Sequence, residues 1–524
     1  MPGDLLLAGG LVVDGSGGPT VTADVLVRAG RVAAIGSGLS AQAVRDVTGR
    51  VVCPGFVDIH THSDLTLLSD PRALSAVHQG VTTEVVGNCG LSVAPLAPGA
   101  PVGPIRQAVG YLDLDPAVDW SWPDLNGYLA VLAAAGPGVN VAALVGHLAL
   151  HASVVGFADR AADPAEIDRM RGLLGEAFDA GAVGLSTGLV YAPLPYVRDA
   201  ELLALASVVA DRDRIFTWHV RNYDDELLDS VGQAVRIARA TGARTQISHL
   251  AAVGRRNWGA VRRALDLVDA ANADGFDVGV DIYPYLHGNA PLSQLLPAYA
   301  QEGGPEAWAP RLRDPALRAE IRAAWLDRPT GWDELTLSWT SRPAPDPVVG
   351  RSIAALAEAA GVDAADLVLD LLAELGNGVL MTAGGRSDDD LRTVLGHPAA
   401  VVASDGLALD PGGVTGAGVP HPRSYGTFPR FLHRYATDLP DAVRRCTSAP
   451  ATRVGLHDRG LLRPGAPADV VVFDPARLTD RATFTAPHQF AAGIDLVLVN
   501  GVVTVDGGAH TGSRAGNVLT TSRA

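Results

Sequence analysis

Several short apolar runs in this 524-residue chain end in side chains that commonly bind metal ions. One run ends in Asp58-Ile59-His60-Thr61-His62, and side chains two apart on a strand point the same way, so His60 and His62 face one site. Further runs end in Cys89, His219, His249 and Asp405. A lone histidine or cysteine of this kind is usually structural, but this set of N, S and O donors suits Zn²⁺. We therefore predict a metal site, provided that these run ends meet.

The elements needed to bring them together can be read from the alternation of strand-like and helical segments. Eight strand-like runs end at His62, Cys89, His147, Thr187, Val220, Leu250, Tyr285 and Gly406. The helical candidates between them include 164–180, 224–241, 258–273 and 351–374. Repeated strand–helix units of this kind predict an α/β fold with a closed (β/α)8 TIM-like barrel over residues 55–455. Chemistry in such barrels sits at the carboxyl ends of the strands, where all six residues fall.

Both ends of the chain are rich in short β-prone segments. Residues 5–13, 21–27 and 31–36 match 469–473, 495–499 and 502–505 in pattern, and Asn500-Gly501 is a typical hairpin turn. We expect one small β-sandwich domain built from residues 1–54 and 456–516. The alternative is two unrelated edge hairpins.

The alternation breaks between the seventh and eighth strand candidates. Residues 288–346 are rich in Pro, Trp and Arg, and we expect an inserted subdomain or lid there. A long irregular loop is the alternative, although loops of that length are uncommon in compact domains.

Composition excludes several classes of protein. With 48% hydrophobic and 19% charged residues, the chain is neither disordered nor collagen-like nor a coiled coil. A net charge of −16 disfavours nucleic-acid binding, and no apolar run is long enough to span a membrane. The start of the chain lacks the basic segment of a secretory leader, and its three cysteines cannot form a disulfide framework, so we expect a cytoplasmic protein.

All 41 basic residues are arginine, and the chain contains no lysine. Biased base composition of the coding sequence explains this, but the consequence is chemical. No lysine can act as a Schiff base, a general base or a carbamylated bridge between metals.

Several motifs resemble the D-aminoacylase (N-acyl-D-amino-acid deacylase) family of the amidohydrolase superfamily. They are PGFVDIHTHSD at 54–64, GVTTEVVGNCG at 80–90, GLSTGLVYAP at 184–193, VDIYPY at 280–285, ASDG at 403–406 and HPRSYGTFPR at 421–430. The resemblance runs from about residue 9 to 516. Many related enzymes bridge two metals with a carbamylated lysine, whereas this family uses a cysteine, and Cys89 stands at the matching place.

The resemblance assigns roles to the metal-binding residues. It implies that Cys89, His219 and His249 hold a tight zinc, and that His60, His62 and Asp405 form a second, weaker position. Asp405 is implied to be the catalytic residue, which takes a proton from metal-activated water and passes it to the departing amine.

The resemblance also implies which residues bind the small-molecule substrate, an N-acyl amide. Arg423 in the HPR motif would bind its α-carboxylate, assisted by Tyr283 and Tyr191; a structural ion pair is the alternative for Arg423. The family commonly carries Lys at the position of Ala251, and His151, His287 or Arg255–Arg256 could replace that cation.

The function implied is zinc-dependent hydrolysis of N-acyl-D-amino acids or a related N-acyl amide, with no nucleic-acid or membrane partner and a possible homo-oligomer. Two alternatives stay open. One is a cyclic-amide hydrolase or deaminase on the same scaffold, and the other is a non-catalytic barrel that binds a small molecule.

Overall fold

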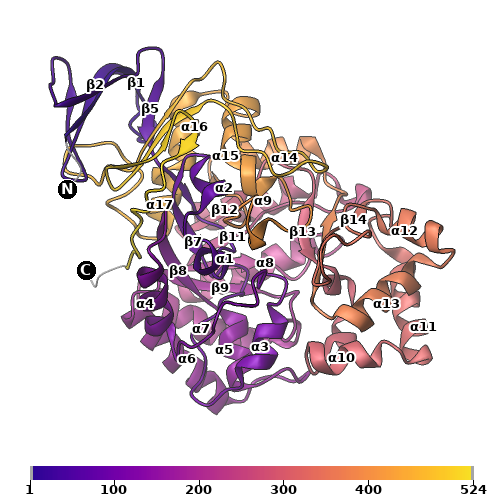
Figure 1. Cartoon of the computed structure of the whole chain (residues 1–524). Helices are drawn as coiled ribbons and strands as arrows, with labels where there is room; N and C mark the ends of the chain where they lie inside the picture. Colours follow the sequence, from indigo (N-terminus) through magenta and orange to yellow (C-terminus); the bar gives the residue numbers. More distant parts are fainter. Residues whose placement is uncertain (1–3, 521–524) are drawn as a thin grey trace.

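The computed structural model describes residues 4–520 and comprises a barrel, a β-domain and a lateral lobe (Figure 1). Residues 1–3 lie outside the described residues. They include the start of the predicted β-domain and part of the segment from which no secretory leader is expected. No helix within residues 4–520 combines the length and the apolar character needed to cross a bilayer.

Eight parallel strands form the barrel. They are β6 (Phe56–Asp58), β7 (Val81–Val86), β8 (Asn140–Gly146), β9 (Gly184–Gly188), β10 (Ile215–His219), β11 (Arg244–Ile247), β12 (Val278–Ile282) and β16 (Ala400–Val402). They are arranged in chain order, and the ring closes just beyond the ends of β6 and β16, where Thr61 pairs with Gly406. The predicted fold class is confirmed, and each predicted run ends within a few residues of a barrel strand.

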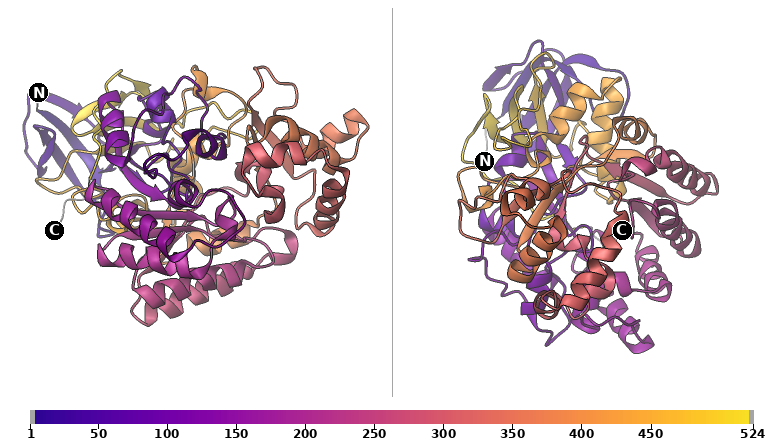
Figure 2. Two further views of the ribbon diagram at one scale, coloured as in Figure 1. Left: turned by 90° about the horizontal axis from the view of Figure 1, so that it is seen from below. Right: turned by 90° about the vertical axis from the view of Figure 1, so that its right-hand side faces the viewer.

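The barrel strands are continuous apolar or small-residue runs because both of their faces are covered. Every residue of β7 and β8 is buried, as expected for parallel strands with side chains inside the ring and helices outside. Figure 2 shows the helices packed around the outside of the strands. Those flanking the barrel are α1 (Thr66–Ser69), α2 (Leu74–Val77), α3 (Val102–Ala108), α4 (Leu125–Ala135), α5 (His147–Val154), α6 (Pro164–Asp179), α7 (Asp199–Asp211), α8 (Leu227–Thr241), α9 (Ala260–Ala273), α14 (Asp388–Leu395), α15 (Arg423–Arg434), α16 (Leu439–Cys446) and α17 (Ser448–Arg453).

Local sequence explains where these helices begin and end. Asp163 caps α6 and exchanges hydrogen bonds with Glu166 in a capping box, while Pro164 occupies the first helical position. Helix α8 ends at Gly242, which adopts the left-handed conformation with φ of 76°. Both helices match their predicted ranges to within three residues.

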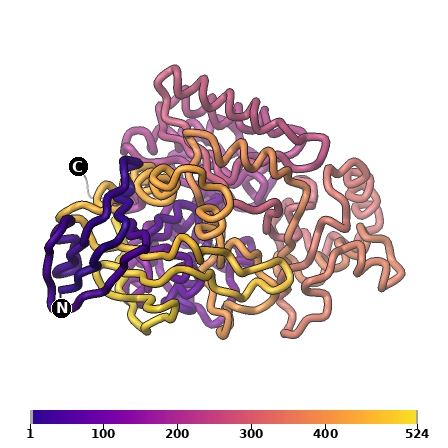
Figure 3. The backbone as a smooth tube through the Cα atoms, turned by 90° about the horizontal axis from the view of Figure 1, so that it is seen from above, coloured from indigo at the N-terminus to yellow at the C-terminus, as the bar shows by residue number. Residues whose placement is uncertain are grey.

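Strands from both ends of the chain share one nine-stranded sheet. They are β1 (Leu5–Val12), β2 (Val21–Arg28), β3 (Arg31–Gly36), β4 (Ala43–Asp46), β5 (Val51–Pro54), β17 (Val470–Phe473), β18 (Ile494–Val499), β19 (Val502–Asp506) and β20 (Ala509–His510). The two sets join where β5 pairs antiparallel with β17. Figure 3 shows the N-terminal segment in indigo beside the C-terminal segment in yellow. A hydrophobic cluster that includes Leu7, Val25, Val470 and Leu498 unites both sets of strands.

The lateral lobe lies between β12 and α14 and has its own core. Its elements are β13 (Gly288–Pro291), α10 (Pro305–Arg311), α11 (Pro315–Ala324), β14 (Leu335–Thr340), α12 (Ile353–Ala360), α13 (Ala364–Leu375) and β15 (Val379–Ala383). Strands β13, β15 and β14 form an antiparallel sheet, and the hydrophobic cluster of the lobe runs from Leu292 to Met381. We therefore propose that this inserted subdomain ends after Ala383, beyond the expected boundary at residue 346.

Candidate metal centre

Closure of the barrel brings three of the predicted ligands together. The backbone N–H of Asp405 donates to the carbonyl of His60, and that of His62 donates to Gly406, both at 2.8 Å. The Asp405 carboxylate consequently lies 3.1 Å from Nε2 of His62 and 3.3 Å from Nε2 of His60. Residues more than 340 positions apart in the chain thus share one end of the barrel.

The Cys89 thiol lies in the middle of the histidines. Its Sγ is 3.2 Å from Nε2 of His60 and 3.6 Å from Nε2 of His249. The ring centroid of His219 is 4.6 Å from that of His249, with the rings nearly perpendicular. The structure therefore brings together all six residues predicted as metal ligands.

The backbone is strained at three of these positions. Cys89, His249 and Asp405 have φ of 54°, 38° and 52°, in the left-handed region that residues with a Cβ rarely adopt. Each of them follows a barrel strand, so the chain turns sharply there and the side chain is directed to the centre. Strain of this kind costs about 1–3 kcal/mol per residue and is concentrated at functional sites.

The acidic members of the centre are held in their charged forms. Burial raises the pKa of the Cys89 thiol, but the charges of His60 and His219 and a hydrogen bond from His249 outweigh it, so the pKa lies well below its usual value. Burial likewise opposes ionisation of Asp405, yet Arg423 and His60 hold its pKa well below the usual range. A thiolate and a carboxylate are the forms that coordinate cations.

The imidazoles respond to this negative charge in different ways. Burial lowers the pKa of His62, but its hydrogen bonds to Asp405 and Cys89 raise the pKa overall to about 9. For His219 burial prevails over the attraction of Cys89 and lowers the pKa to about 4, so its ring is neutral at pH 7. A neutral imidazole is the form that binds metal.

The donor atoms fall into two groups that could each hold an ion. In one group the donors of His60, His62, Cys89 and Asp405 all lie within 4.8 Å of one another, and in the other those of Cys89, His219 and His249 do. Cys89 belongs to both groups. Among the described residues, buried Nδ1 of His62 and Nε2 of His219 have no hydrogen-bond partner, which leaves both atoms available to a cation. The donor set fits zinc.

One residue that orients this centre was not predicted. The buried Asp281 on β12 accepts hydrogen bonds from Nδ1 of His60 at 3.2 Å and from the backbone N–H of His249 at 2.8 Å. A carboxylate behind a ligating histidine fixes its tautomer and ring orientation. The sequence did contain a signal for Asp281, because it is a charged residue inside the apolar run 278–282. A charged residue buried in such a run needs hydrogen-bond or ionic partners.

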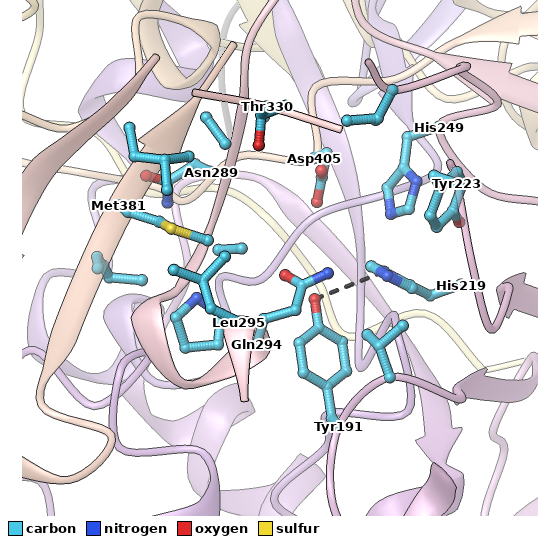
Figure 4. Close-up of a pocket in the computed structure, with 18 of the residues that line it drawn as sticks. Tyr191, His219, Tyr223, His249, Asn289, Gln294, Leu295, Thr330, Met381 and Asp405 are labelled. Atoms are coloured by element: carbon cyan, nitrogen blue, oxygen red, sulfur yellow. Dashed lines mark hydrogen bonds between the residues drawn. The ribbon is translucent and has the colours of Figure 1, made fainter. Parts of the chain in front are cut away.

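A cavity of about 340 Å³ opens beside the ligands. Figure 4 shows His219, Tyr223 and His249 on one side of it, with Asn289, Leu295 and Met381 of the lobe on the other. The predicted substrate residues Tyr191, Tyr283 and Arg423 all line it. The hydroxyl of Tyr191 lies 3.5 Å from Nδ1 of His219, and Nη1 of Arg423 lies 2.7 Å from Oδ2 of Asp405.

Other cations considered from the sequence lie elsewhere. His151 is buried against Glu201 at an N–O distance of 2.8 Å, and Arg256 forms exposed ion pairs with Asp225 and Asp327. His287, Arg255 and Arg256 are also absent from the lining of the cavity. The residues weighed as substitutes for a lysine at Ala251 therefore lie outside the lining of this cavity.

Comparison with known proteins places this fold and site in one family. The model of the amidohydrolase family matches residues 43–505. N-acyl-D-glutamate deacylase of Alcaligenes xylosoxydans xylosoxydans is 38% identical over 95% of this chain and 93% of its own length. The chain belongs to the amidohydrolase family, in the group that contains the D-aminoacylases.

Solved structures agree with this assignment. The N-acyl-D-glutamate deacylase of Bordetella bronchiseptica, solved with zinc and a phosphonate that mimics the tetrahedral intermediate, matches with a TM-score of 0.83. It is 35% identical, and the match covers 99% of this chain and 100% of that one. A second match is a D-aminoacylase structure that concerns the binuclear metal centre of that enzyme, with activation by one metal and attenuation by a second. Its TM-score is 0.82 and its identity 34%, over 99% of this chain and 100% of that one.

Proposed function

We propose that this protein is a zinc-dependent amidohydrolase that cleaves the amide bond of N-acyl-D-amino acids. One observation carries the proposal. A buried cysteine with a low pKa lies between two groups of metal-binding side chains, and a carboxylate stands beside it at the bottom of a cavity. Family membership and the deacylases among the relatives support the same reaction.

Cys89, His219 and His249 would hold the tighter zinc, and His60, His62 and Asp405 would complete a weaker second position. When bound, zinc would lower the pKa of water and polarise the scissile carbonyl. Asp281 would keep His60 in the tautomer whose Nε2 faces the centre, because it accepts a hydrogen bond from Nδ1 at 3.2 Å.

Asp405 would move the proton during hydrolysis. Its low pKa keeps it charged, so it can accept a proton from the attacking water. It would then donate that proton to the amine nitrogen as the C–N bond breaks. The products are a carboxylic acid and a free amino acid, and Asp405 is again a carboxylate. Arg423 lies 2.7 Å from the far oxygen of Asp405 and fixes the orientation of the carboxylate.

The substrate would bind along the cavity between the metal ligands and the lobe. Arg423 and Tyr283, whose ring lies 4.7 Å from the guanidinium carbon, would bind its α-carboxylate. Tyr191 would contact the amide end, since its hydroxyl faces His219. The protein would act in the cytoplasm, where its three buried cysteines form no disulfide bonds.

The test is hydrolysis of matched stereoisomers by the zinc-loaded protein. N-acetyl-D-methionine and N-acetyl-L-methionine should be distinguished, with release of the free amino acid from the D isomer at least tenfold faster. Dihydrouracil and adenine serve as probes for ring opening and deamination. Turnover of either probe with no hydrolysis of acetylated amino acids would contradict the proposal.

A further inference from the structure

The substrate cavity contains a second guanidinium group beside Tyr283. Arg386 lines the cavity, and its guanidinium carbon lies 4.9 Å from the centroid of the Tyr283 ring. Arg423 contacts the same ring at 4.7 Å. Two cations therefore adjoin one phenol ring, where the substrate carboxylate would be bound.

Arg386 is the uncommitted member of this pair. Arg423 is ion-paired with Asp405, and Arg221, another arginine of the cavity, donates to Gln233 and to the carbonyls of Pro195 and Val197. Within residues 4–520, no carboxylate forms an ion pair with Arg386, and its buried Nη1 has no hydrogen-bond partner. Arg386 as a whole is half-buried, but a buried N–H group without an acceptor is costly, and a ligand carboxylate would supply that acceptor.

The backbone holds Arg386 firmly at this place. The carbonyl of the preceding Gly385 accepts hydrogen bonds from the N–H of Gly254 at 2.8 Å and from the indole of Trp258 at 2.9 Å. On the other side, Ser387 caps helix α14. The loop that binds Gly385 begins just after Ala251, the position at which the resembling family carries a lysine.

Space for the guanidinium depends on a neighbouring glycine. A Cβ added to Gly288 would lie 3.1 Å from Nη2 of Arg386 and 3.6 Å from the hydroxyl of Tyr283. The donors of Arg386 and Tyr283 therefore converge above Gly288. Any larger residue there would crowd them.

We propose that Arg386 receives the α-carboxylate of the substrate, together with Tyr283 and Arg423, and supplies the cation that Ala251 does not. A planar guanidinium binds a carboxylate through two parallel hydrogen bonds, which favours substrates with a free carboxylate. The inference rests on the proposed function and assigns to Arg386 the selection of substrates that carry a free α-carboxylate over N-acyl amines and N-acyl amino-acid amides, which lack one.

The test compares N-acetyl-D-methionine with N-acetyl-D-methioninamide, which lacks the carboxylate. Arg386→Met should raise KM for the acid about 10- to 100-fold, since hydrogen bonds to charged groups are lost, and leave KM for the amide unchanged. Arg386→Lys should restore part of the affinity. Gly288→Ala should weaken binding of the acid in the same selective way but to a smaller extent, because the added Cβ would lie 3.1 Å from Nη2 of Arg386 and push the guanidinium slightly aside.

Two other arginines serve as controls. Arg255→Met changes an exposed side chain that stacks on Trp258 outside the cavity, and it should leave both KM values unchanged. Arg328 also lines the cavity, and its buried Nη1 likewise has no hydrogen-bond partner, but it stacks on Trp332, away from Tyr283, with its guanidinium carbon 3.3 Å from the ring centroid. If Arg328→Met raised KM for the acid and Arg386→Met did not, the inference would be overturned.

A measurement of substrate binding without turnover tests this inference separately from the proposed function. Calorimetric titration of N-acetyl-D-methionine into zinc-loaded Asp405→Asn protein, with and without Arg386→Met, reports carboxylate recognition without turnover. Equal affinities would refute the role of Arg386 even if hydrolysis is normal. Failure of the parent protein to hydrolyse any N-acyl amino acid would contradict the proposed function, whatever the titration shows.

Discussion

Asp405 is the side chain on which the proposed chemistry depends most. Replacing it with Asn keeps the volume but removes the base, so we expect kcat to fall at least 10³-fold. The tighter zinc should remain, because Cys89, His219 and His249 are unchanged. Elemental analysis and a hydrolysis assay on the same sample measure both effects.

The exposed Asp389 offers a matched control for this substitution. Asp389→Asn should retain wild-type turnover. Zinc-loaded Asp405→Asn that turns over at the wild-type rate would remove the carboxylate from its assigned role.

At the scale of elements, the loop after β7 positions Cys89 through its glycines. Gly87 has φ of 80°, and a Cβ there would lie 2.4 Å from the carbonyl oxygen of Leu144 on β8. Gly87→Ala should therefore distort the loop, lower the midpoint of thermal unfolding and reduce zinc content. Gly99 has the same φ but no atom within 4 Å of an added Cβ, so Gly99→Ala should cost only about 1 kcal/mol and keep its zinc. Equal zinc content in the two variants would contradict this role of the loop.

A buried network ties helix α5 to helix α7 and gives a pH-dependent contribution to stability. Burial opposes ionisation of Glu201, but hydrogen bonds from His147 and His151 outweigh it and lower its pKa from 4.5 to about 2. Because the folded pKa lies below the unfolded one, the stabilisation is complete above about pH 5 and is lost as the pH falls towards 2.

Glu201→Gln should therefore destabilise the protein by about 2–3 kcal/mol at pH 7 and by less at pH 4. Urea unfolding at the two pH values measures the difference, and the exposed Glu358→Gln is the control. A destabilisation that does not shrink at the lower pH would show that the charge of Glu201 contributes nothing.

The barrel could be predicted from sequence because its strands are buried on both faces and therefore read as short apolar runs. The predicted helix 351–374 proved to be two helices, α12 and α13. Its Ala- and Leu-rich ends favour a single helix, but Gly361 turns left-handed at φ of 67° and Asp363 caps the second helix. Asp281 and Arg386 were missed, because a single charged residue has no periodic pattern and its partners lie far away in the chain.

The whole molecule is built from parts with separate cores. Leu337 is fully buried in the core of the lobe, whereas Leu144 is buried inside the barrel. Either Leu→Ala change should cost about 2–5 kcal/mol. Leu337→Ala should raise KM and keep zinc, since the lobe forms one wall of the cavity, and Leu144→Ala should lose zinc as well. Loss of zinc from Leu337→Ala would show that the metal centre depends on the lobe.

The central claim is that Cys89 and histidines from distant strands hold zinc at one end of the barrel. Zinc content of purified wild-type protein and of Cys89→Ala, with Cys53→Ala as a buried cysteine outside the centre, tests it most directly. We predict about one to two zinc ions per chain in wild type and Cys53→Ala, and almost none in a folded Cys89→Ala. Wild-type protein without zinc, or Cys89→Ala with the full amount, would contradict the account.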